Sequence, residues 1–470
     1  MAVKINHKRL YNERDLYMKI IISGCGKIGT TILSNLVAEG HDIVAIDSNP
    51  AVIEEITNVY DVMGVCGNGF DSDILEEADV GGTELFIAAA GSDESNLMSC
   101  YLARKLGVKH TIARVRNPEY NDKSLGILCQ HFELSLAINP ERLAAREIFS
   151  ILKFPSALKI EYFARGNFEL VELKLKNDSI FDGMKISELK AKYKTNVLCC
   201  CVLREDKVSV PNGDFVLKSG DRVGFAGTHL DIYKFFKDAG IAQKQSKSVM
   251  ILGGGRICYY LADMLSTIGA SVKIIDKNEE KCSELSDSLP KAIIINADGT
   301  QQDLLMEEGL RSVDAFVSLT GMDEQNILIS IFASAQDVPK VITKVNKDEL
   351  ATMAEKLGLD TLISPKSIVS DVIIRYARAL YDSLGSSVEK LYKFMDGKVE
   401  ALEYIISEDS KLINIPLKDL KIKKGILIGG IMRDRKPIVP GGNDVILKGD
   451  HIVIFAANQK ISGLSDIMEK

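Results

Sequence analysis

The segment from residue 18 to residue 50 limits the possible folds of this chain more than any other part of the sequence. An apolar run at 20–22 is short enough for a buried strand, and a second run at 43–46 ends on Asp47. Between the two runs a glycine-rich loop precedes a helical pattern of apolar residues, and the loop reads Gly24-Cys25-Gly26-Lys27-Ile28-Gly29. Strand, G-x-G-x-x-G loop, helix, strand and acidic residue together form the dinucleotide-binding fingerprint. The segment therefore predicts a βαβ unit that binds an adenine nucleotide.

Each residue of this fingerprint has a physical role in the prediction. Gly24 permits a tight turn, Gly26 lets the backbone approach a pyrophosphate, and Gly29 lets the helix and the strand pack closely. The first turn of the helix offers backbone N–H groups and the positive end of the helix dipole to phosphates. Asp47 is expected to accept hydrogen bonds from ribose hydroxyls and to repel a 2′-phosphate.

Composition excludes several classes of protein. A chain of 470 residues is too long for one core, so two to four domains are expected. The net charge of −7 argues against a general nucleic-acid binder, which needs a basic surplus to neutralise phosphates. The longest apolar runs, such as 292–295, are far shorter than a membrane span. Any association with a membrane is therefore expected to occur through a partner.

Cysteine usage predicts a cytosolic protein with reduced thiols, because the nine cysteines are irregularly spaced. Cys199-Cys200-Cys201 could suggest a metal site, but neighbouring residues of a strand point to opposite faces and no second cluster completes the ligand set. A buried strand is the favoured interpretation. Residues 1–17 are polar, and we expect either a disordered tail or an extension ahead of a start at Met18.

The whole unit occurs twice in the chain. A second loop follows another apolar run, and it reads Gly253-Gly254-Gly255-Arg256-Ile257-Cys258. Gly24 and Gly253 are 229 residues apart, and so are Asp47 and Asp276. The correspondence continues beyond the fingerprint, since 93–96 matches 323–326 and 217–221 matches 447–450. We therefore predict a tandem duplication.

Each copy predicts an α/β domain followed by a smaller one. Strand and helix patterns alternate as in a doubly wound, Rossmann-like parallel sheet, with the strands of the first copy expected at 19–23, 42–47, 61–65, 84–89, 110–115 and 132–137. Helices that begin near a proline are expected at 140–153 and 365–380. The shorter β-branched runs that follow predict small α+β domains. The expected division is a tail at 1–17, nucleotide-binding domains at 18–138 and 248–363, crossover helices at 139–156 and 364–387, small domains at 157–240 and 388–470, and a linker at 241–247.

Further polar residues follow the predicted strands, and ligands of doubly wound sheets lie at the carboxyl ends of the strands. In the first copy, Asn68 could bond an adenine edge, Arg114 could reach phosphates, and Asp93 and Asn96 could either contact the ligand or cap a helix. In the second copy the equivalent residues are Asp298 and Lys344, and Asp276 keeps its position. Cys258 replaces the third glycine, while Arg256 could either hold phosphates or obstruct them. Weaker or differently selective binding is therefore expected at the second loop.

With the duplication in view, the sequence resembles the TrkA family, the peripheral nucleotide-binding subunits of Trk-type potassium uptake systems. The resemblance extends from Met18 to the C-terminus and rests on the fingerprint, on 111–118 (TIARVRNP), on 138–141 (INPE) and on the duplicated Leu-Lys-(x)-Gly-Asp turn. It implies two tandem regulator-of-potassium-conductance (RCK) units, each with a TrkA-N and a TrkA-C domain. It further implies that the chain binds NAD(H), ATP or ADP, forms homo-oligomeric rings on the cytosolic face of the membrane, and gates an integral membrane potassium-transporting subunit.

Two other functions remain open on the sequence alone. A soluble NAD-dependent oxidoreductase would need acid–base groups beside the nucleotide, and of the six histidines only His131 is expected near a crevice. Catalysis is therefore not expected. A nucleotide-sensing module of another transporter, or one that binds a cyclic dinucleotide through its small domains, is the second alternative. In either sensing role, nucleotides shift a conformational equilibrium only if they bind its two states with different affinities.

Overall fold

The computed structural model describes residues 18–120, 122–163, 166–382, 388–408, 410–459, 461 and 463–469. The predicted tail at 1–17 lies outside the described residues. The described residues form two compact units, which divide between residues 139 and 140. The predicted α/β class with two tandem Rossmann-like domains and two small domains is confirmed, as the following sheets show.

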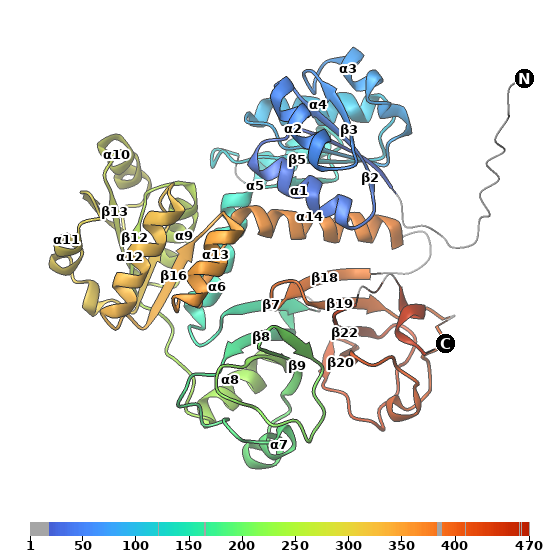
Figure 1. The fold of residues 1–470 in the computed structure, drawn as a ribbon, viewed down its shortest axis with the longest axis vertical. Coiled ribbons are helices and arrows are strands. Elements are labelled where there is room, and N and C mark those ends of the chain that lie inside the picture. The colour runs from blue at the N-terminus through green and yellow to red at the C-terminus, as the bar shows by residue number, and fades with distance from the viewer. Residues whose placement is uncertain are drawn as a thin grey trace, which may run out of the picture. The chain divides into compact units, whose positions relative to one another are not determined.

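The first unit is a doubly wound domain built on a six-stranded parallel sheet of order β3-β2-β1-β4-β5-β6 (Figure 1). Its strands are β1 (Lys19–Ser23), β2 (Asp42–Asp47), β3 (Met63–Cys66), β4 (Leu85–Ala88), β5 (His110–Arg114) and β6 (Leu136–Ile138). Its helices are α1 (Lys27–Ala38), α2 (Pro50–Val59), α3 (Ser72–Glu77), α4 (Asp93–Lys105) and α5 (Asp122–His131), with a 3-10 turn at Val80–Gly82. The strand order reverses between β1 and β4, so a ligand crevice is expected at the carboxyl ends of these two strands.

Sequence patterns account for most of these elements. The residues of β1 from Ile20 to Ile22 are fully buried because both faces of a parallel sheet are covered by helices. The expected strand at 132–137 is wrong in its position, because α5 continues to His131 and β6 begins only at Leu136. A turn with Glu133 at φ 53° separates the two elements, and the apolar residues Phe132 and Leu134 pack into the core from this turn.

The second unit begins with the helix α6 (Pro140–Lys153) and contains a second parallel sheet of order β14-β13-β12-β15-β16-β17. The strands of this sheet are β12 (Ser248–Leu252), β13 (Ser271–Asp276), β14 (Ile293–Asn296), β15 (Ala315–Ser318), β16 (Lys340–Lys344) and β17 (Leu362–Ile363). Its helices are α9 (Arg256–Thr267), α10 (Glu279–Ser288), α11 (Gln302–Glu307), α12 (Asp323–Ala335) and α13 (Asp348–Lys356), with a 3-10 turn at Leu310–Ser312. The two sheets have the same topology, which confirms the duplication.

The small domains are five-stranded antiparallel sheets of matching order, β10-β9-β11-β8-β7 and β18-β19-β22-β20-β21. The first small domain contains β7 (Lys159–Phe163), β8 (Phe168–Lys174), α7 (Ile186–Tyr193), β9 (Leu198–Arg204), β10 (Lys207–Ser209), β11 (Arg222–Gly227) and α8 (His229–Asp238). The second contains β18 (Val388–Phe394), β19 (Val399–Ile405), β20 (Ile426–Arg433), β21 (Lys436–Ile438) and β22 (His451–Ala457), with 3-10 turns at Leu417–Asp419 and Leu464–Ile467. The helix α14 (Pro365–Asp382) connects the second sheet to this domain.

The helix α6 belongs structurally to the second nucleotide-binding domain, not to the domain that precedes it in sequence. Its apolar stripe, which includes Ala144, Ile148 and Leu152, lies in one core with Leu261 and Leu265 of α9. It also packs against α14. The contact between these apolar faces explains why a helix encoded with the first copy is buried by the second.

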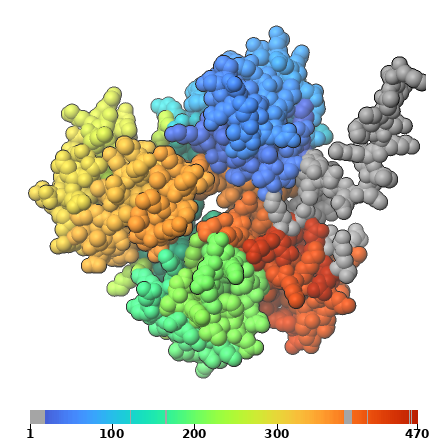
Figure 2. Space-filling model, in the orientation of Figure 1, coloured from blue at the N-terminus to red at the C-terminus, as the bar shows by residue number. Residues whose placement is uncertain are grey.

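The two small domains share a core. Figure 2 shows them side by side, the first small domain in green and the second in red. Phe163 and Phe168 of the first domain pack there with Phe394 and Phe455 of the second. The cysteine segment lies in β9, as predicted, but the reasoning about its faces was wrong. The pairing of β11 with β9 passes from Cys201 to Cys199, so Cys200 forms a β-bulge, and the Sγ atoms of Cys200 and Cys201 are 3.8 Å apart.

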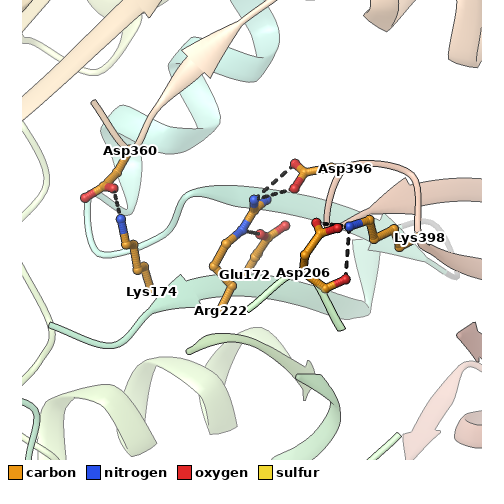
Figure 3. Close-up of polar contacts among 7 residues, drawn as sticks. All are labelled: Glu172, Lys174, Asp206, Arg222, Asp360, Asp396 and Lys398. Carbon is orange, nitrogen blue, oxygen red and sulfur yellow. Dashed lines mark hydrogen bonds and ion pairs between the residues drawn. The ribbon is translucent and has the colours of Figure 1, made fainter. Parts of the chain in front are cut away.

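Charged residues connect the first small domain to both later domains of the same unit (Figure 3). Lys174 pairs with Asp360 of the second nucleotide-binding domain, and Lys398 pairs with Asp206. Arg222 lies between Glu172 and Asp396, with N–O distances of 2.5 and 2.8 Å. The carboxylate of Glu172 is 1 % exposed, so this arginine neutralises a buried charge.

Within the described residues, no helix has the length and apolar character that crossing a membrane requires.

Candidate functional site

The glycine loop of the first domain passes closely between α1 and the end of β4. Gly24 has φ +91°, and a Cβ at this position would lie 2.4 Å from the backbone nitrogen of Ala90. A Cβ on Gly29 would lie 2.0 Å from the carbonyl oxygen of Gly24. Both glycines are therefore required for the observed turn, as the fingerprint predicted.

Asp47 holds this loop from the end of β2. Its Oδ2 accepts a hydrogen bond of 2.7 Å from the backbone N–H of Cys25, and its Oδ1 accepts one of 2.9 Å from the N–H of Asn49. A carboxylate can accept more than one hydrogen bond at each oxygen. The half-buried side chain thus shapes the loop and keeps acceptor capacity at the position where the fingerprint expects a ribose.

The remaining loop residues differ in the direction they face. The thiol of Cys25 lies 3.7 Å from the carbonyl of Ile46, and burial raises its pKa to about 12, so the thiol is inert and faces inward. Gly26 and Lys27 are exposed, and Ile28 is half-buried. A Cβ on Gly26 would meet no heavy atom of the described chain within 4 Å. Space for a ligand therefore exists directly above the first turn of α1.

Asp93 and Asn96 are buried and bind the backbone around the crevice. Asp93 accepts hydrogen bonds of 2.8 Å from the N–H groups of Arg116 and Asn117. Asn96 is fully buried; its Oδ1 accepts from Ala90 N at 2.7 Å, and its Nδ2 donates to the carbonyls of Ala90 and Arg114. Both amide hydrogens of Asn96 are used in this way, so the side chain positions the ends of β4 and β5 instead of reaching outward.

The other two predicted residues of the first site lie at the same edge of the sheet. Asn68 is exposed in the loop after β3, and Arg114 is the half-buried last residue of β5. The small size of Gly69 serves packing as well as space, because a Cβ there would lie 1.8 Å from the hydroxyl of Ser23.

The second domain repeats the arrangement with changed residues. Gly253 has φ +103°, and Asp276 accepts a hydrogen bond of 2.6 Å from the N–H of Gly254. Asn326 donates to the carbonyls of Thr320 and Lys344, as Asn96 does in the first domain. Gly255, Arg256 and Ile257 open α9, and the exposed Arg256 has the position of Lys27.

Three residues distinguish the second site from the first. Cys258 is fully buried and carries a Cβ where the first domain has Gly29, so the close approach to the loop carbonyl cannot be repeated. Lys344 donates to the carbonyl of Leu319 at 3.4 Å. Asp298 is exposed, and hydrogen bonds from Thr300 lower its pKa. The second site is therefore more acidic than the first at the position of Asn68.

The structure brings all the predicted site residues of each copy to one edge of one sheet, but whether they bind a nucleotide stays a prediction. Sequence reasoning missed that Asp47, Asp93 and Asn96 bind the backbone around the crevice. Their repetition at Asp276, Asp323 and Asn326 was the available signal, since loop-holding residues must be kept wherever the loop is kept. Among the described residues, no group of three or more His, Cys, Asp or Glu side chains could hold a metal ion.

Comparison with known proteins decides the family. The TrkA-N domain family matches residues 20–130 and 249–365, and the TrkA-C domain family matches residues 170–240 and 401–469. The chain is 30% identical over 451 residues to a Trk system potassium uptake protein TrkA homolog of Archaeoglobus fulgidus, covering 96% of this chain and 100% of the relative. This chain belongs to the TrkA family. The TrkA protein of Haemophilus influenzae is 28% identical, covering 94% of this chain and 96% of that one.

The TrkA fold also occurs in a solved structure described as the GsuK channel bound to NAD. Its TM-score is 0.63 at 18% identity, covering 95% of this chain and 78% of that chain. This likeness shows that the two chains share a fold.

Proposed function

We propose that this TrkA-family chain is the nucleotide-sensing regulatory subunit of a Trk-type potassium uptake system, and that it acts by binding rather than by catalysis. Family membership supports the role in potassium uptake. The observation that most supports nucleotide sensing is the geometry of the first glycine loop. Asp47 accepts a hydrogen bond from the backbone N–H of Cys25 there, and the space above Gly26 is open. A helix N-terminus with this geometry binds phosphates.

The residues of the first site fit an adenine dinucleotide. The backbone N–H groups of Lys27, Ile28 and Gly29 lie in the first turn of α1, where they have no intrahelical acceptor and would bind a pyrophosphate. Asp47 would bind the ribose hydroxyls and would exclude a 2′-phosphate, so NAD(H), ADP and ATP are the proposed ligands. Lys27 and Arg114 would supply positive charge to the phosphates.

The second site is proposed to bind more weakly or to prefer a different adenine nucleotide. Cys258 carries a Cβ where the first loop has Gly29, and the charged Asp298 replaces Asn68 beside the expected adenine. Such a difference would allow one nucleotide to set the resting state and another to shift it, because only differential affinity for two conformations moves an equilibrium. A tenfold preference for one conformation corresponds to about 1.4 kcal/mol per site.

The proposed partners are an integral membrane potassium-transporting subunit and further copies of the chain in a ring on the cytosolic face of the membrane. Two arrangements in the structure suit such a role. The second unit joins α6 and the first small domain, which belong to the first copy, with the domains of the second copy, and the first nucleotide-binding domain is a separate compact unit. We therefore assign the response to nucleotides to the first nucleotide-binding domain, and the structural framework to the second unit.

Calorimetric titration with NAD, ADP and ATP tests the proposed binding. Gly26→Asp places a carboxylate in the open space above the helix N-terminus, where it would compete with phosphate. We expect this variant to lose the tighter binding event, whereas Gly255→Asp, the matched change in the second domain, should leave it. Equal affinities in the wild-type chain and in Gly26→Asp would contradict the assignment.

A further inference from the structure

A groove beside the first nucleotide site has no role in the account so far. It has a volume of about 430 Å³ and lies at the rim of the first domain, between the start of α4, the loop after β5 and α5. The residues that line it are Glu94, Asn117, Glu119, Tyr120, Ser124, Ile127 and Leu128.

The groove combines an apolar wall with negative charge. Ile127 is 50% exposed and lines the groove together with Leu128. Among the described lining residues, the charged ones are Glu94 and Glu119, and both are exposed. Glu94 accepts hydrogen bonds from Ser92 at 2.6 Å and from the hydroxyl of Tyr120 at 3.2 Å. These hydrogen bonds lower the pKa of Glu94, which keeps it ionised.

The second domain provides a comparison, because the counterpart of Glu94 in that domain has its charge neutralised by a lysine. The backbone N–H of Asn117 donates to Asp93, and the N–H of Lys347 donates to Asp323 in the same way. The two residues therefore occupy the same place in the two copies. The ammonium group of Lys347 lies 2.9 Å from Glu324, the counterpart of Glu94. The first copy has an asparagine instead of this lysine, so the charge of Glu94 faces the groove.

We propose that this groove on the first nucleotide-binding domain is the docking site for a Lys/Arg-rich cytosolic segment of the integral membrane partner. The occupant follows from charge complementarity, because two carboxylates beside an exposed isoleucine suit a segment with both basic and aliphatic side chains. Cytosolic loops of membrane proteins carry an excess of lysine and arginine. The same carboxylates would repel an anionic lipid surface.

The position of the groove explains how docking and nucleotide binding are coupled. Asp93 binds the N–H groups of both Arg116 and Asn117, and Asn117 lines the groove. Arg116 and Arg114 lie at the carboxyl end of β5, beside the proposed nucleotide site. One loop thus forms part of both sites, and a change in its conformation on binding one ligand alters affinity for the other reciprocally. The coupling and the choice of an integral membrane partner as the occupant both rest on the function proposed above, whereas the preference of the groove for a basic segment does not.

The first test measures binding of a short fluorescent peptide of Lys-Leu-Lys-Gly repeats to the full chain by anisotropy, with a Glu-Leu-Glu-Gly peptide as the control. Asn117→Lys introduces the lysine that the second domain has, and Glu94→Gln removes one charge without changing shape. We expect each variant to weaken peptide binding, Asn117→Lys by about tenfold because it both neutralises Glu94 and repels the peptide. Lys347→Asn, the reverse change in the second domain, should not weaken it. Unchanged affinity in both groove variants, or equal binding of the acidic peptide, would overturn the proposal.

Titration of NAD into the same proteins separates this proposal from the proposed function. Peptide binding without any nucleotide binding would overturn the function and leave the groove standing, and the reverse result would overturn the groove alone. A photo-crosslinking amino acid at Ile127 of the full chain in native membranes then identifies the occupant. A crosslink that sequences to a Lys/Arg-rich cytosolic segment of the integral potassium subunit supports the proposal. A crosslink to another copy of this chain overturns it.

Discussion

Replacement of Asn96 by alanine should loosen the crevice of the first domain even though this side chain does not face outward. The amide makes three hydrogen bonds to the backbone, of 2.7, 3.1 and 2.9 Å, and it is 0% exposed. Each bond contributes about 1 kcal/mol net, and each buried partner left unsatisfied costs roughly 1–3 kcal/mol. Because water can reach some of these partners after relaxation, the expected loss is roughly 3–5 kcal/mol.

Hydrogen exchange read at the amides of β4 and β5 is the suitable assay, because a chain of several domains has no single free energy of unfolding. A loss of this size should accelerate exchange in these strands on the order of a hundredfold or more. The control is Ser92→Ala, which removes the exposed cap of α4, a hydrogen bond of 3.3 Å, together with the hydrogen bond from Ser92 to the exposed Glu94, for an expected loss of about 1 kcal/mol. Exchange in Asn96→Ala no faster than in Ser92→Ala would refute the assignment of Asn96 as the residue that joins β4 to β5.

Three further predictions concern the second unit. Lys340 is 7% exposed and donates to the carbonyl of Ala157 at 2.8 Å, and burial lowers its pKa from 10.5 to about 7. Between these two pH values the unfolded chain therefore binds more protons than the folded chain. The free energy of unfolding should rise with pH from about 7 to 10.5, by up to about 1.4 kcal/mol per pH unit. Melting temperatures against pH should show a shallower rise in Lys340→Met, and identical pH profiles would contradict the depressed pKa. Arg222→Ala should destabilise the second unit by about 3–5 kcal/mol, because it leaves the carboxylate of Glu172 buried without its cation. Asp396→Asn, which changes the half-exposed partner of Arg222, should cost about 1 kcal/mol or less. Similar melting temperatures for the two variants would refute this ranking. A Cβ on Gly430 would lie 2.8 Å from the ring of Phe168 in the other small domain. Gly430→Cys, which introduces the residue found at the equivalent position 201, should therefore destabilise the pair of small domains by about 1–3 kcal/mol in a thermal melt. The control Gly441→Ala, whose Cβ would lie 3.6 Å from Asp444, should change the melting temperature little.

Local sequence patterns predicted the nucleotide-binding folds because the apolar runs, the glycine loop and the terminal aspartate lie within one continuous segment. The same reasoning succeeded for the second copy because the repeat preserves its spacing. The strand expected at 132–137 was misplaced, since a turn with positive φ at Glu133 allows two core residues to be buried without a strand.

Features that depend on distant segments were not accessible from the sequence. The pattern of α6 indicates an apolar face, but not that this face is covered by α9. The alternation of a regular strand predicted opposite faces for Cys200 and Cys201, and only the pairing with β11 creates the bulge that brings their sulfur atoms together. Asp93 and Asn96 are residue types typical of ligand contacts or helix caps, but their actual partners are backbone groups at the ends of β4 and β5 and in the loop after β5.

Potassium flux in vesicles tests the account most directly. The chain would be co-purified with its integral membrane subunit and reconstituted, and flux would be recorded with and without NAD, ADP and ATP at the cytosolic face. The account predicts that at least one nucleotide changes the flux, that Gly26→Asp removes this response, and that the variant still binds the membrane subunit. Flux that is indifferent to every adenine nucleotide, or a response that persists in Gly26→Asp, would contradict it.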